Sequence, residues 1–159
     1  MAVTKKDPTK LLKAKKPLGI SRGLKEIKNL IKAAELEKTT LDTLYVVDMS
    51  DKVVTLSIEI GDSGQTSNMT IMLDNKTITS NQSGNFPKTN LGTNKELNGK
   101  KLSIVANIAD TSKETNLTSL TINLTGGQED IILPLSKTVE ADGESEDYLC
   151  LIEFFNPNI

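Results

Sequence analysis

The feature that most constrains the fold of this sequence is a change of hydrophobic period near Thr40. Before this residue, apolar side chains recur at spacings of three and four positions; after it, they alternate with polar ones. Alternation over four to eight residues places apolar side chains on one face of an extended strand and polar ones on the other. We therefore expect a helical segment before Thr40 and β-sheet after it.

Five alternating apolar segments follow Thr40, with turn signals between them. They are Val54–Ile60, Met69–Leu73, Leu102–Ile108, Leu120–Leu124 and Ile131–Leu135. Further strands are expected at 44–47 and, after an Asp-Asn turn, at 76–79, while Pro134 favours an edge position. About seven short strands separated by turns predict an antiparallel β-sandwich over residues 41–159, of immunoglobulin-like or jelly-roll type.

Residues 80–100 are polar and interrupted by glycine and proline. A structureless loop of this length is uncommon in a compact domain. Residues 86–91 are therefore interpreted as a short edge strand, with a turn at 97–100 into the next strand. The alternative is an exposed loop, which in a sandwich is a common place for a binding site.

The last strand, expected at 148–155, is apolar on both faces. Tyr148 to Phe154 place four apolar side chains on one face, and Leu149, Leu151 and Phe155 lie on the other. A strand of this kind is usually covered on both faces. One face is expected to join the core, and the other needs a second cover, for which the amphipathic helix described next is a candidate.

The segment before Thr40 divides into a basic arm at 1–20, expected to be flexible when alone, and an amphipathic helix at 21–38. Leu24, Ile27 and Ile31 fall on one helical stripe together with Leu30 and Ala34. Because an apolar stripe must cover something, the helix is expected to pack on its own sandwich, in a partner's groove or on a membrane surface.

Charge separates the same two parts of the chain. Residues 1–38 carry 11 Lys/Arg and 4 Asp/Glu, and residues 39–159 carry 8 and 17. A basic arm on an acidic body is typical of an interaction tail, although it also fits a solvated terminus or an arm lying across its own body. The candidate partner-binding residues are Lys10, Lys13, Lys15, Lys16, Leu24, Ile27 and Ile31. With one Arg and no aromatic residue, the arm does not favour nucleic acid.

The sequence offers few candidate residues for catalysis or metal binding. The chain has no His and one cysteine, Cys150, so it has no His-dependent nucleophile and no Cys-rich zinc site. Cys150 is expected to be a buried small apolar residue, and no cofactor is expected. The acidic run at 140–147 is interpreted as a solvated hairpin tip. Its weak candidate metal ligands, or alternatively docking residues for the arm, are Asp142, Glu144, Glu146 and Asp147.

The sequence therefore predicts a non-enzymatic structural or protein-interaction module, which could be a subunit of a larger assembly. Its expected partner is a protein or a second copy of the chain, rather than nucleic acid or membrane. The alternative is a ligand-binding sandwich for carbohydrate or calcium. One unpaired cysteine and the lack of a long apolar run favour a cytoplasmic location.

Overall fold

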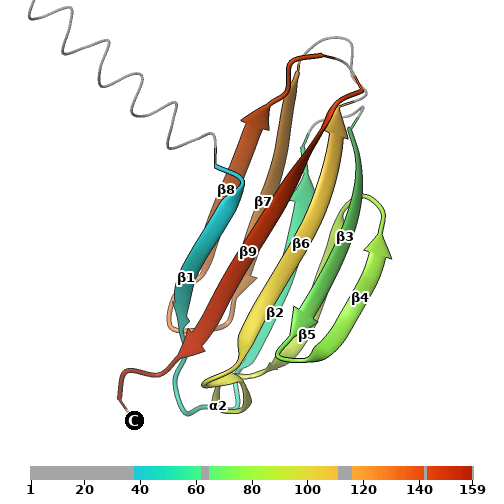
Figure 1. Ribbon diagram of the computed structural model, residues 1–159. Helices are drawn as coiled ribbons and strands as arrows, with labels where there is room; N and C mark the ends of the chain where they lie inside the picture. Colours follow the sequence, from blue (N-terminus) through green and yellow to red (C-terminus); the bar gives the residue numbers. More distant parts are fainter. Residues whose placement is uncertain (1–37, 62–64, 111–115, 142, 159) are drawn as a thin grey trace, which may run out of the picture. The chain divides into compact units, whose positions relative to one another are not determined.

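A computed structural model describes residues 38–61, 65–110, 116–141 and 143–158 of this protein (Figure 1). They belong to one compact unit, Leu36–Ile159. The arm expected at 1–20 and all but the last residue of the helix expected at 21–38 lie outside the described residues.

The described residues contain nine strands and one short helix. The strands are β1 (Thr40–Val46), β2 (Val53–Ile60), β3 (Gln65–Leu73), β4 (Lys76–Gln82), β5 (Phe86–Thr93), β6 (Lys101–Asp110), β7 (Leu117–Thr125), β8 (Ile131–Thr138) and β9 (Ser145–Phe155). The helix α2 (Asn94–Leu97) starts at a capping box, in which Thr93 and Glu96 each bond the other's backbone amide.

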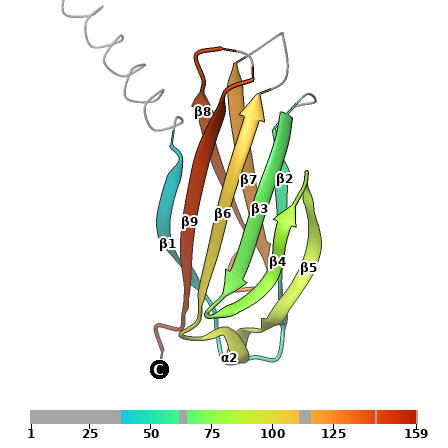
Figure 2. The same ribbon diagram turned by 45° about the vertical axis from the view of Figure 1, so that its right-hand side comes forward.

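The strands form two sheets that face each other as layers (Figures 1 and 2). Sheet A has the order β1-β9-β6-β3-β4, and sheet B has the order β5-β2-β7-β8. Neighbouring strands are antiparallel, except that β1 runs parallel to β9. This arrangement confirms a mainly β sandwich.

The core lies between the inner faces of the two sheets and is mostly aliphatic. Strand alternation supplies it: on β6, Leu102, Ile104, Ala106 and Ile108 are buried, while the residues that alternate with them point outward. The same alternation buries Leu56 and Ile58 of β2. Period-two patterning in the sequence therefore places the core where it was expected.

Three details differ from the sequence-based expectation. The sheets are not antiparallel throughout, because β1 and β9 pair in parallel. Two parallel neighbours need a long connection between them. β1 and β9 have one, because they are the first and last strands of the domain in sequence. The acidic segment 140–147 is not a hairpin tip, because its first part lies in the connection from β8 of sheet B to β9 of sheet A, and its last three residues belong to β9. The 80–100 stretch includes the expected edge strand, β5, followed by the helix α2, which was not predicted.

Tyr45 links the two sheets near one end of the sandwich. Its ring leaves β1 and packs edge-on against Phe154, with 6.0 Å between ring centroids. Its hydroxyl donates to the Glu129 carbonyl oxygen (2.7 Å) and accepts from the Gly127 amide (2.9 Å). A Cβ on residue 127 would lie 2.6 Å from the ring, so the glycine makes room for this link. The β1 edge is thereby joined to the β7–β8 turn.

Tyr148 makes a second link between the sheets. Its hydroxyl lies 2.6 Å from the Thr118 hydroxyl, which itself donates to the Lys137 carbonyl oxygen (2.7 Å). Because Thr118 uses its single proton for that carbonyl, Tyr148 is the donor to Thr118. Both residues are buried. The chain's two tyrosines therefore both join sheet A to the β7–β8 hairpin.

Asn94 holds the loops together at the end of the sandwich that carries α2. The side chain is fully buried. Its amide nitrogen donates to the carbonyl oxygens of Lys52 and Gly126, both at 2.8 Å, and its oxygen accepts from the Asp48 amide at 3.1 Å. One amide group thus satisfies three backbone groups from two different connections.

Replacing Tyr45 with Phe should lower the free energy of unfolding by about 1–3 kcal/mol, because the Gly127 amide and the Glu129 carbonyl lose their partner. Urea titration measures the change. Thr89→Val is the control, because it removes a hydroxyl that bonds the carbonyl of Pro87, two residues away, and should change the value by less than about 0.5 kcal/mol. Equal effects of both substitutions would contradict the role given to Tyr45.

Replacing Asn94 with Ala should cost about 2–4 kcal/mol, because three buried backbone groups lose their partners at about 1 kcal/mol or more each. The matched control is Asn90→Ala, since the exposed Asn90 side chain accepts a local bond from Gly92. Thermal unfolding should separate the two variants by several degrees. A melting temperature for Asn94→Ala at or above that of Asn90→Ala would contradict this account.

Candidate interaction surface

An apolar surface lies on the outer face of sheet A, over its central strands β6 and β9. We call it the β6–β9 face and define it by Val105, Leu149, Leu151 and Phe155. Their side chains are exposed by 51, 41, 39 and 40 %. Isolated exposed apolar residues are ordinary, but a contiguous group on one sheet face marks an interaction surface.

The register of the strands brings these residues together. Val105 of β6 lies directly opposite Leu149 of β9, and Ser103 lies opposite Leu151. In each strand the residues between them point inward to the core, because successive side chains alternate between faces. The strand β9 is therefore apolar on both faces for two different reasons: one face forms the core, and the other forms this surface.

Charged and polar pairs lie at both ends of the group formed by Val105, Leu149 and Leu151, and Phe155 lies beyond one of these pairs. Lys101 lies opposite Glu153 at one end, and Asn107 lies opposite Asp147 at the other. The Asn107 amide nitrogen donates to the Asp147 carboxylate at 2.7 Å. The result is an apolar centre with a polar border, as in protein interfaces.

The structure also contains a depression of about 250 Å³ beside Lys101. It is lined by Asp42, Lys101, Leu151, Ile152 and Glu153. Its lining combines an apolar side chain of the β6–β9 face with charges of both signs. The surface is therefore concave at this end and has room for a side chain of a partner.

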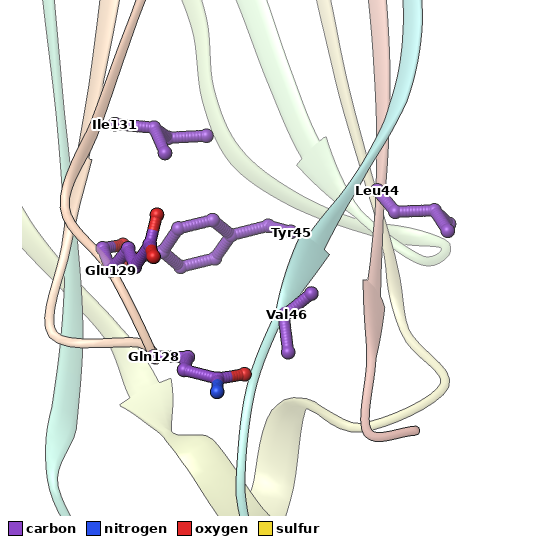
Figure 3. A pocket seen from close by; sticks show the side chains of 6 residues that line it. All are labelled: Leu44, Tyr45, Val46, Gln128, Glu129 and Ile131. Carbon is purple, nitrogen blue, oxygen red and sulfur yellow. The ribbon is translucent and has the colours of Figure 1, made fainter.

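A separate pocket of about 290 Å³ lies between β1 and the start of β8 (Figure 3). Its lining includes Tyr45, Gln128, Glu129 and Ile131. Figure 3 shows the Tyr45 ring directed from β1 toward Glu129, while Leu44 points to the other side of the strand. Burial raises the pKa of the Tyr45 hydroxyl, which keeps it protonated and bound to the backbone. Its hydroxyl thus acts as a structural link.

Cys150 is fully buried on the inner face of β9, which confirms the sequence-based expectation. Burial raises the pKa of its thiol from 9.0 to about 12. A thiol with this pKa is protonated at neutral pH and is a poor nucleophile. The residue acts as a small apolar group in the core.

The structure places some of the predicted site residues but not others. The seven partner-binding residues predicted in the arm and helix lie outside the described residues, as does Asp142. Glu144 accepts a hydrogen bond from the Glu140 amide, and Asp147 accepts one from Asn107. No group of three or more His, Cys, Asp or Glu within the described ranges is placed to hold a metal ion.

Sequence reasoning did not single out Val105 as part of a candidate surface. It stands between the core residues Ile104 and Ala106, and a valine at an outward strand position is common. Only the β6–β9 register, which places Val105 against Leu149, makes it part of a surface. The apolar outer positions of β9, in contrast, were visible in the sequence.

Comparison with models of protein families, with curated proteins and with solved structures gave no match. Among the helical residues that the structure describes, no stretch has the length and apolarity needed to cross a bilayer. The geometry of the described residues is therefore the basis for a functional proposal.

The Cys150 thiol should resist a maleimide at pH 7 in the folded chain and react readily once urea unfolds it, because burial holds it in the neutral form. Mass spectrometry of the adduct measures both rates. Rapid labelling under native conditions would contradict the burial of this residue.

The free energy of unfolding should also depend on alkaline pH. Folding raises the pKa of Cys150, so the unfolded thiol ionises first and stability is lost as pH rises from 9.0 to about 12. Burial also raises the pKa of both tyrosines from 10.0, which adds to the same decline. A Cys150→Ala variant should show a shallower decline in urea titrations over this range, and an identical slope would contradict the assignment.

Proposed function

We propose that this chain is a non-enzymatic structural or protein-interaction module, a subunit of a larger assembly, and that it binds another protein through the β6–β9 face. The observation that supports this most is the exposure of four large apolar side chains, 39–51 % each, on one face of a sheet. Covering these side chains with a partner is favourable by about 25 cal/mol for each Å² of apolar surface removed from water.

The composition of this face also supports protein binding. Its centre is aliphatic with one Phe, and charged side chains stand at the ends. Depletion of charge at the centre and a polar border are typical of protein interfaces. The face is built on two central strands of a sheet, so its side chains are held in fixed positions and a partner need not order them.

We also infer that the sandwich is of the immunoglobulin-like rather than the jelly-roll type. In sheet A, β3, β6 and β9 are neighbours, as are strands C, F and G of an immunoglobulin sandwich, and β2 pairs β5 as B pairs E. The hairpin β7–β8 then follows the F-like strand and places β7 beside β2, where the first strand lies in the immunoglobulin order. The parallel β1 is an addition at the G-like edge.

Photocrosslinking in the producing cells tests the proposed interaction. p-Benzoylphenylalanine in place of Val105 or Leu149 should give products heavier than the 17.3 kDa chain. The matched control is the same residue in place of Ile132, which is 69 % exposed on sheet B. A lack of products at Val105 and Leu149, or equal yields at all three positions, would contradict an interaction through this face.

A further inference from the structure

We propose that the partner of the β6–β9 face is the same face of a second copy of this chain. This inference rests on the proposed function, because it identifies the partner for the same surface. The two copies are related by a two-fold axis that runs parallel to the strands, midway between β6 and β9. The two outer faces of sheet A then pack against each other, with β6 of one copy over β9 of the other.

The register of β6 and β9 makes the apolar centre self-complementary about this axis. Val105 and Leu149 are opposite each other within the sheet, so the rotation places Val105 over the partner's Leu149. The same rotation places Leu149 over the partner's Val105. In the next row Leu151 faces the partner's Ser103, a small side chain that leaves room for it. Each contact therefore occurs twice, as an isologous interface requires.

The charges at the end of the face are complementary about the same axis. Lys101 and Glu153 are opposite each other within one copy, so Lys101 comes to lie over the partner's Glu153, and Glu153 over the partner's Lys101. At the other end Asn107 lies over the partner's Asp147, and its amide nitrogen donates to Ser145 and Asp147 of its own copy. Opposite charges across an interface select this register and steer association.

A different two-fold axis fails the same test. An axis in the plane of the interface but perpendicular to the strands would place β9 over the partner's β9 in the reverse direction. With that axis midway between Leu149 and Leu151, Glu153 would approach the partner's Asp147, and two carboxylates would face each other. Like charges that face each other oppose association, so the axis parallel to the strands fits the charges better.

The size and shape of the sheet also suit this packing. Five strands about 4.8 Å apart and about nine residues long give a face of roughly 700 Å². Specific interfaces bury about 800 Å² on each partner, and the overlapping strands β1, β9, β6 and β3 supply most of this face, while β4 extends beyond the partner. An axis parallel to the strands leaves the two sheets aligned, which is the usual geometry for sheets packed face to face.

Light scattering after size exclusion of the full-length chain tests the proposal. The parent should have twice the mass of one 17.3 kDa chain. Leu149→Lys and Leu151→Lys should each raise the dimer dissociation constant by about a hundredfold or more and give monomers, because each introduces a charge in the apolar centre. Ile132→Lys, at a more exposed apolar position on sheet B, should stay dimeric. Circular dichroism spectra equal to that of the parent confirm that each variant is folded.

A charge-reversal pair tests the two-fold axis itself. Lys101→Glu carries Glu at positions 101 and 153, and Glu153→Lys carries Lys at both. Each variant alone should be monomeric, since like charges then face each other across the axis. Mixed in equal amounts, the two variants should form a heterodimer, since every facing pair is again opposite in sign. Glu59→Lys, an exposed charge reversal on β2 of sheet B, should leave the parent dimer unchanged.

The outcomes separate this inference from the proposed function. A monomeric parent, a dimer that tolerates Lys at 149 and 151, or a mixture of the two charge variants that stays monomeric would overturn the second-copy inference. In the first two of these cases, crosslinks from Val105 to proteins of other masses would leave the proposed function standing with a different partner. A monomeric parent destabilised by Leu151→Lys would assign the cover of this face to the chain's own residues, which also overturns the inference.

Discussion

The relative position of the two sheets depends on hydrogen bonds from two tyrosine hydroxyls. Aliphatic packing between the sheets is strong but not directional, so it would allow them to slide. Tyr45 and Tyr148 instead bond defined backbone and hydroxyl groups of the β7–β8 hairpin, one near each end of it. Tyr45 reaches Glu129 across 84 positions of sequence. Together with Gln65 of β3, which bonds the Leu117 carbonyl and the Ser119 amide of β7, these hydroxyls fix the register between the sheets that packing alone leaves open.

The two links also bear on the outer face of sheet A. Tyr148 belongs to β9, and Tyr45 belongs to β1, which pairs with β9. Successive side chains of a strand point to opposite faces of the sheet. Bonds that hold the inward side chains of β1 and β9 therefore also fix which side chains point outward. The strands that carry the β6–β9 face are thus also held from the inner side of the sheet. A surface prepared in this way loses little conformational entropy on binding.

Much of the fold follows from period-two alternation, and the candidate β6–β9 face follows from it only in part. Alternation predicted the segments of most strands, and Pro134 marked β8 as an edge, which the strand order confirms. The double apolar character of β9 indicated a surface that needs cover. Pairing between distant strands has no local signal, so neither the parallel β1–β9 pair nor the opposition of Val105 and Leu149 could be predicted. The predicted arm and helix lie outside the described residues.

Strand β9 lies between β1 and β6 in the middle of sheet A, although it is the last strand in the sequence. During vectorial synthesis, β1 therefore leaves the ribosome long before its neighbour exists. Sheet A cannot close until nearly the whole domain has been made, and β6 must wait with one edge open. Such high contact order slows folding to the range of milliseconds to seconds. Until β9 arrives, the nascent chain exposes an unpaired strand edge, which is the kind of surface that chaperones protect.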